Sequence, residues 1–272
     1  MSRLLRANFT RLWRNRLFWI AIVIVLATAV AAVFNQAQYT YVPDGLLFSG
    51  INIISVIAAV FVSIFTGTEY SDGTMRNKLA VGHSRVAVYF ANLIVCVAAA
   101  LIMHIALIAV VVCLGVPVIG TFTLDAGLAA KLFIYSILVV TVYAAIFVLC
   151  SMLITSKAAG AITVIFLTYA MIGGAIVLFR ILEAPEYSEA YVLDEESGTE
   201  YAVGGRPNPR YLTGAKRKAA EWVLDLLPAG EAMRIQLADQ ADPPDQIPLW
   251  AVSVTAVTVI AGVTVFRKKD LK

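Results

Sequence analysis

The residues that could do chemistry in this sequence gather in one short polar stretch, residues 67–85, between two long apolar runs. Asp72 can accept a hydrogen bond from free backbone N–H groups and is predicted to cap the start of a short helix. Gly82 adopts the left-handed conformation at little cost, which predicts the end of that helix. Ser84 can cap the next helix. We therefore expect a helix of about two turns between Asp72 and Gly82.

The predicted short helix carries an apolar face flanked by charge. Met75 and Leu79 are four residues apart and therefore share one side of a helix. Arg76 and Lys78 flank that side. Two apolar side chains ringed by charge suit docking into a groove of a partner protein. The alternative is a solvated loop whose basic residues only set the orientation of the chain in a membrane.

Several common kinds of chemistry are missing from the sequence. It contains no G-x-x-x-x-G-K-[ST] phosphate loop, so it has no ordinary site for ATP. It also lacks the H-E-x-x-H and G-x-S-x-G patterns of zinc proteases and serine hydrolases. Cys96, Cys113 and Cys150 lie in apolar runs without a C-x-x-C pair, so we interpret them as packing residues. We expect neither a catalytic residue nor a cofactor or metal in this chain.

Three polar side chains lie inside or at the edge of the apolar runs and are candidates for lining a translocation path. Asn52 and Asn92 need hydrogen-bond partners in hydrocarbon, from another helix or from a substrate, and we favour another helix. His104 could titrate at membrane depth. Because no aspartate or glutamate lies between the ends of the predicted spans, we interpret His104 as an interhelical hydrogen-bonding residue rather than a proton relay.

The apolar runs around these residues indicate an integral membrane protein. Of the 272 residues, 60% are hydrophobic and 14% charged, whereas a soluble domain carries about 25% charged residues. The net charge of +3 is too small to indicate nucleic acid as a partner. We predict an all-α polytopic fold with six transmembrane helices, each near or above the ~20 residues that cross a bilayer. The predicted spans are Leu17–Phe34, Leu46–Phe65, Val86–Leu114, Ala129–Leu153, Ala158–Ile181 and Ile247–Phe266.

Lysine and arginine in the short loops predict which way the chain lies in the membrane. Basic residues concentrate in residues 1–16, in the stretch 67–85 and in the tail after the last span, while the loops 35–45 and 115–127 contain none. By the positive-inside rule, both termini are therefore cytoplasmic. Residues 1–16 are predicted to form an amphipathic helix in the headgroup layer, or to act only as a basic topology signal. Its predicted apolar stripe is Leu5, Phe9, Leu12 and Trp13.

Residues 183–246 form the one long segment outside the predicted spans, and the orientation places them outside the cell. Pro207, Pro209 and Gly214 interrupt this segment. An amphipathic helix follows and is expected to end at Pro228. We favour a helix packed on the outer ends of the spans over a substrate-binding helix. Its apolar residues are Ala219, Trp222, Val223, Leu226 and Leu227.

The polar stretch 69–79, followed by Gly82-His83-Ser84-Arg85, resembles the loop after the second span of bacterial ABC-2 type permeases, which are arranged like type V exporters. The order of the spans and the long loop before the last one extend the resemblance over most of the chain. The resemblance implies that this loop holds a coupling helix that contacts an ATPase subunit. It also places Glu69 where similar permeases tie that helix to neighbouring segments, with Arg6 or Arg11 as its partner. The implied coupling residues are Glu69, Asp72, Thr74, Met75, Arg76, Lys78, Leu79 and Arg85.

This resemblance predicts the permease subunit of an ATP-binding cassette exporter in a bacterial plasma membrane. ATP and Mg would be bound by a separate ATPase, present in two copies, and a second permease, the same or homologous, would complete the path within the lipid bilayer. The apolar spans favour an amphiphilic substrate, such as an antimicrobial peptide, an antibiotic or a lipid-like molecule. The alternatives are a membrane scaffold or sensor, and a secondary transporter, which the lack of buried carboxylates disfavours.

Overall fold

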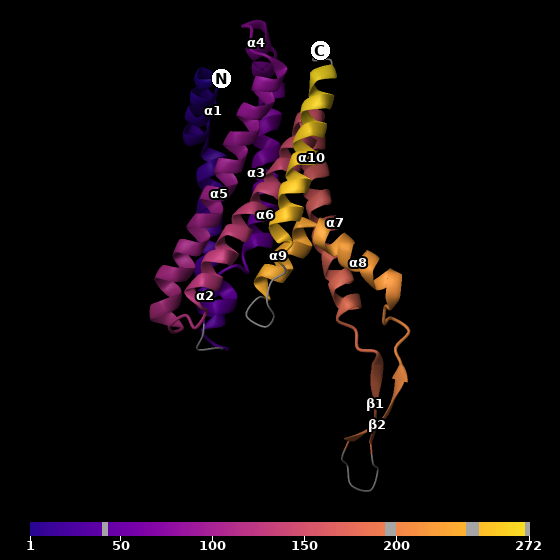
Figure 1. Ribbon diagram of the computed structural model, residues 1–272. Helices are drawn as coiled ribbons and strands as arrows, with labels where there is room; N and C mark the ends of the chain where they lie inside the picture. Colours follow the sequence, from indigo (N-terminus) through magenta and orange to yellow (C-terminus); the bar gives the residue numbers. More distant parts are fainter. Residues whose placement is uncertain (40–42, 194–199, 238–244, 270–272) are drawn as a thin grey trace.

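The fold is a bundle of long helices with both ends of the chain at the same side (Figure 1). The computed structural model describes residues 1–39, 43–193, 200–237 and 245–269. Six of the described helices are long and apolar enough to cross a membrane, which confirms the predicted all-α, six-span fold. They are α2 (Arg16–Gln36), α3 (Ile51–Ser71), α5 (Arg85–Val118), α6 (Ala126–Leu153), α7 (Lys157–Leu182) and α10 (Ile247–Lys268).

The centre of the bundle is α6, which packs against α3, α5, α7 and α10. Its inward side and that of α3 are lined by large buried side chains such as Phe61, Phe65, Tyr143 and Phe147. The outer helices α2, α7 and α10 bury much less of their surface and leave apolar side chains exposed, among them Phe166. These outward faces are therefore available to lipid or to another membrane protein.

Polar residues at the ends of the helices satisfy the free backbone N–H groups there. The side chain of Asn15 accepts a hydrogen bond from the Leu17 amide at the start of α2 (2.8 Å). Asp125 accepts from two amides at the start of α6, and Ser156 accepts from the Ala159 amide of α7 (3.4 Å). These caps fix where the spans begin.

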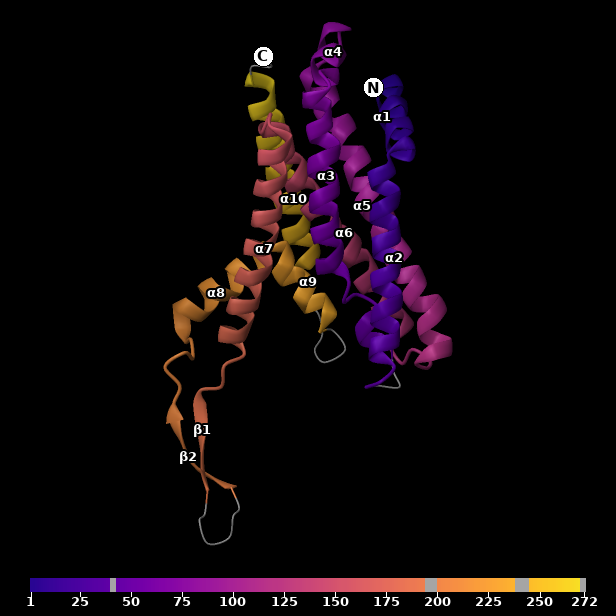
Figure 2. The ribbon, with the colours of Figure 1, turned by 180° about the vertical axis from the view of Figure 1, so that it is seen from behind.

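Helix α1 (Ser2–Arg14) stands beside α5 and leads into α2 after a break at Asn15 (Figure 2). The predicted amphipathic helix exists, but its buried stripe is Leu4, Asn8 and Leu12. The predicted stripe is wrong for Trp13, which is 48% exposed. The prediction counted apolar residues alone, whereas Asn8 faces inward because it meets a polar partner on α5.

The segment before the last span has more structure than the single helix predicted for it. Strands β1 (Tyr187–Leu193) and β2 (Glu200–Pro207) form an antiparallel hairpin that projects from the bundle, at the end away from the termini (Figure 1). Helices α8 (Gly214–Leu226) and α9 (Pro228–Gln236) follow. Pro228 does end α8, but it also starts α9, at a position where a helix does not need its missing N–H group.

The buried side of α8 also differs from the prediction. Ala220 and Leu224 are buried, while Trp222 is 67% exposed and packs edge-on against Trp250 of α10. Helix α9 turns back and packs against α6, α7 and α3. Part of the segment predicted as an external loop, helix α9, therefore packs against the spans.

Candidate functional site

The candidate site is a short helix and its attachments at the end of the bundle that carries both termini. Helix α4 (Thr74–Ala80) joins α3 to α5 (Figure 1). It ends as predicted at Gly82, which has a positive φ of 97°. The amide of Gly82 donates to the Leu79 carbonyl (2.9 Å) and that of His83 to the Lys78 carbonyl (3.1 Å), the Schellman arrangement. Ser84 caps α5 as predicted, accepting from the Ala87 amide (3.2 Å).

The start of α4 differs from the prediction. Asp72 is not its N-cap, because α3 continues through Ser71 and Asp72 ends that helix instead. Gly73, with φ of 67°, then turns the chain into α4. The prediction ended the second span at Phe65, where the apolar run stops. The polar residues that follow remain helical because they find partners within the protein.

The most important of these partners belong to Glu69, whose side chain is completely buried on α3. One carboxylate oxygen pairs with both Arg11 of α1 and Lys78 of α4. The other accepts from the side-chain amide of Asn92 on α5 (2.9 Å). A single carboxylate thus connects four helices. The sequence left Arg6 and Arg11 open as partners, and the structure selects Arg11.

Asn8 closes this polar cluster. Its side chain donates to the Asn92 oxygen (3.1 Å) and accepts from the Lys78 ammonium (2.9 Å). We call Glu69, Asn8, Arg11, Lys78 and Asn92 the Glu69 cluster. Burial lowers the pKa of the Lys78 ammonium, and the adjacent carboxylate opposes that shift. A buried ion pair needs such additional hydrogen bonds to compensate for the lost hydration of its charges.

A second set of bonds attaches the end of α10 to the same region. Lys269 donates to the Tyr70 hydroxyl (3.1 Å) and to the Met152 carbonyl (2.9 Å). Arg85, predicted as a coupling residue, donates to the backbone carbonyls of Phe266 and Lys269. Because the last carbonyls of a helix lack partners, this arginine caps α10. These hydrogen bonds therefore connect the ends of α3, α5, α6 and α10.

The apolar face predicted for docking points mostly inward. Met75 is only 1% exposed and Leu79 is partly buried, so the prediction that both face a partner is wrong for Met75. The outward side of α4 presents Arg76 and Asn77, followed by Val81, which is 80% exposed. Asn77 and Val81 were not predicted as exposed contact residues, since one apolar residue beside a glycine gives no periodic signal. Thr74, also exposed, donates to the Glu69 carbonyl (3.2 Å).

The three polar residues predicted at membrane depth all bond between helices. Asn92 belongs to the Glu69 cluster, and the Asn52 oxygen accepts from the Tyr143 hydroxyl of α6 (3.3 Å). His104 Nε2 lies 2.7 Å from the Ser136 hydroxyl of α6. Because that hydroxyl donates to a backbone carbonyl, Nε2 carries the proton and donates to it. All three residues therefore have the interhelical bonds that were expected, and their part in a translocation path stays a prediction.

Comparison with known proteins bears on the part of the chain that contains this site. A family model described as "ABC-2 family transporter protein" matches residues 4–175. The match runs from α1 into α7 and so includes α4 and the whole Glu69 cluster. No curated protein matches the chain.

Proposed function

Since this chain belongs to the ABC-2 family of transporter proteins, we propose that it is the permease subunit of an exporter driven by a separate ATPase. The permease role follows from the family, whose members are the membrane subunits of ABC transporters. Beyond that role, we propose where the chain contacts the ATPase, how many subunits assemble, how the chain is oriented in the membrane and which class of substrate it moves.

The observation that carries the proposal is the attachment of α4 through the Glu69 cluster. Helix α4 is short, lies at the end of the bundle and exposes Arg76, Asn77 and Val81. The same helix is tied to α1, α3 and α5 by Lys78 and the buried carboxylate. A force applied to its outer side therefore reaches three helices at once, as a coupling helix requires. An ATPase groove that accepts Val81 between the polar neighbours would supply that force.

The distribution of charge supports a cytoplasmic location for this end. Its exposed basic residues include Arg3, Arg6, Arg76, Arg267 and Lys268. Positive residues near span ends favour the cytoplasmic side. The hairpin end, which holds most of the acidic residues, then lies outside the cell, and the membrane is the plasma membrane of a bacterium.

The exposed apolar helices support an assembly of two permeases and two ATPases. Six spans provide only one side of a translocation path, and the outward faces of α2, α7 and α10 are free to contact a second permease, the same or homologous, and lipid. The polar groups between the spans are few and mostly neutral, among them Asn52, His104 and Tyr143. Such a path suits an amphiphilic substrate, for instance an antimicrobial peptide, an antibiotic or a lipid-like molecule.

The substitution Val81→Asp tests the proposed contact. It replaces an apolar side chain by a charge that a partner groove would have to bury without a counter-ion. We expect the variant to insert normally, but to lose co-purification with the ATPase and at least tenfold in ATP-driven transport in reconstituted vesicles. Tyr39→Asp is the matched control, since Tyr39 is 77% exposed and follows α2, at the end of that helix away from α1. Full co-purification and transport by Val81→Asp would show that α4 is not the coupling element.

A further inference from the structure

Helix α9 carries a carboxyl group into the bundle from the segment that the sequence placed outside it. Glu231, in the first turn of α9, is 2% exposed. Neither of its carboxyl oxygens has a hydrogen-bond partner among the described residues. The absence of a buried carboxylate disfavoured proton-linked function in the sequence analysis. The structure corrects that point, because a fold-back helix supplies the carboxyl.

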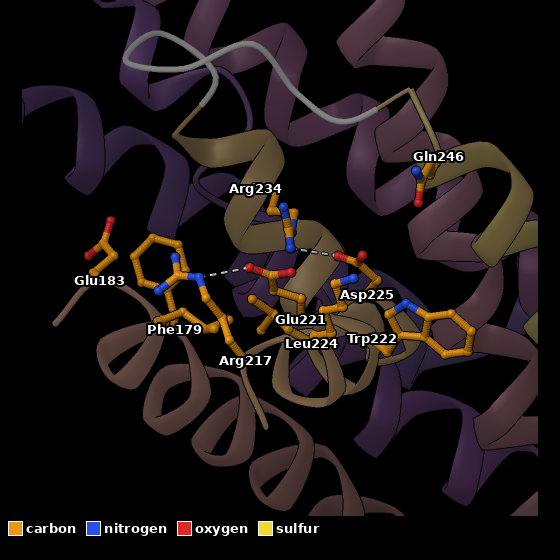
Figure 3. Close-up of a pocket in the computed structure, with 11 residues that line it drawn as sticks. Phe179, Glu183, Arg217, Glu221, Trp222, Leu224, Asp225, Arg234 and Gln246 are labelled. Carbon is orange, nitrogen blue, oxygen red and sulfur yellow. Dashed lines mark hydrogen bonds and ion pairs between the residues drawn. The ribbon is translucent and has the colours of Figure 1, made fainter. Parts of the chain in front are cut away.

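The groups around Glu231 do not neutralise a negative charge there. From α6 the titratable neighbour is Tyr143, whose hydroxyl donates to Asn52 of α3. From α8 it is Asp225, itself paired with Arg234 of α9 at 2.7 Å (Figure 3). On α7, Arg180 is exposed. The titratable residues of α3 lie near its far end.

Burial, followed by the charge of Asp225, raises the pKa of Glu231 from 4.5 to about 8. An ionised carboxylate at this place would lack the partners that buried charges need. The carboxyl group is therefore neutral while α9 remains packed in the bundle.

A pocket lined by residues of α7, α8 and α9 lies beside the helix that carries Glu231. Its volume is about 660 Å³, and Phe179 of α7, Trp222 and Asp225 of α8 and Arg234 of α9 line it (Figure 3). Asp225 is thus both a wall of the pocket and the charge that, after burial, raises the pKa of Glu231. Glu231 does not line the pocket itself, so a proton from the pocket reaches the buried carboxyl only when α9 opens.

We propose that Glu231 is a proton-binding site that determines whether α9 stays packed against α3, α6 and α7. With the proton bound, the neutral carboxyl is compatible with the apolar surroundings. After the proton leaves, the charge favours a position of α9 in which water can reach the carboxylate. This inference goes beyond the proposed function, because it concerns the end of the bundle away from α4 and requires no ATPase.

The pH dependence follows from the direction of the pKa shift. The pKa of Glu231 is higher in the packed state than in the open state, so packing of α9 is most stable below pH 4.5 and is lost as the pH rises through about 8. Between these values the packing equilibrium should fall about tenfold for each pH unit. Above that range it should level off.

Hydrogen exchange on the full chain in lipid nanodiscs tests this dependence. The exchange protection of residues 228–236, corrected for the intrinsic effect of pH on amide exchange, should fall about tenfold per pH unit between about pH 5 and pH 8. Glu231→Gln should keep its protection constant across this range. Glu183→Gln, which changes an exposed carboxyl lining the same pocket, should behave as wild type.

Protection of wild-type α9 that does not change with pH would overturn the proposal, as would an equal fall in Glu231→Gln. Infrared difference spectra give a second readout that does not depend on the exchange of α9. The carbonyl stretch of a protonated carboxyl should be present in wild type at pH 6, disappear by about pH 9, and be missing in Glu231→Gln. A wild-type spectrum without that band at pH 6 would show that Glu231 is ionised and refute the site.

Discussion

We expect the substitution Glu69→Gln to loosen the attachment of α4 to the bundle. Glutamine preserves the shape of the side chain, but it removes the negative charge and replaces one acceptor by a donor. The side chains of Arg11 and Lys78 are only 30% and 15% exposed. Both cations would then remain largely buried without a counter-ion, and the one remaining oxygen would have to replace two, of which one serves the cations and the other the Asn92 amide.

The size of the effect follows from this geometry. Removing one partner of a buried ion pair costs about 3–5 kcal/mol. Arg11 keeps its bond to the Phe65 carbonyl (3.0 Å) and its position over the Phe65 ring, and water reaches part of its side chain. We therefore expect the lower end, about 3 kcal/mol in the free energy of unfolding. Equilibrium denaturation in mixed micelles can measure it.

A double-mutant cycle with Lys78→Met separates the ion pair from general disturbance. Glu69→Gln leaves both Arg11 and Lys78 without a counter-ion, and Lys78→Met leaves Glu69 paired with Arg11 alone. The double variant removes both charges of the α3–α4 pair, so that only Arg11 lacks its counter-ion. The cost of the double variant should be at least about 1 kcal/mol smaller than the sum of the single costs. Additivity within about 0.5 kcal/mol would refute the reasoning. In vesicles with the ATPase, Glu69→Gln should transport less substrate for each ATP hydrolysed, while hydrolysis itself continues.

Two further substitutions examine the packing between the spans. Gly262→Ala on α10 should destabilise the protein by about 1–3 kcal/mol, because a Cβ there would overlap the Tyr89 hydroxyl of α5. Adding Tyr89→Phe should recover part of this loss. An unchanged melting temperature of Gly262→Ala would contradict the close contact. His104→Asn should retain most transport with an unchanged pH profile, because the histidine bonds to Ser136 of α6 and not to a carboxylate. Transport that stops while ATP hydrolysis continues would instead indicate a direct role of His104.

The spans, the end of α4 and the start of α5 could be predicted because each depends on local sequence. A run of about 20 apolar residues is long enough to cross a bilayer and is unfavourable in water, so it predicts a span wherever it occurs. Gly82 and Ser84 act on backbone groups within a few residues of themselves. The inward direction of Met75 was not predictable in this way. It depends on how α4 meets α3, and an apolar side chain suits either a partner or the protein's own core.

The Glu69 cluster and α9 were harder to predict for a different reason. Asn8 and Arg11 lie far from the other members of the cluster in the sequence, and only the packing of α1 against α5 brings them together. Polar residues at span ends look solvent-exposed until their partners are known. Helix α9 was not predicted because it begins with proline and small residues, which are typical of loops.

The two carboxylates that are buried in the described part of the chain have opposite surroundings, which suit different roles. Glu69 meets two cations and an amide, so its charge is held in place and its bonds resist movement of α4 relative to α3 and α5. Glu231 meets no hydrogen-bonding partner among the described residues, so a negative charge there disfavours the packed position of α9, as proposed above. A fully paired carboxylate suits transmission of force, and an unpaired one suits a response to pH. Helix α3 packs against both α4 and α9, and its Asn52 meets Tyr143, the neighbour of Glu231. Movement of α4 can therefore reach α9 through one continuous helix.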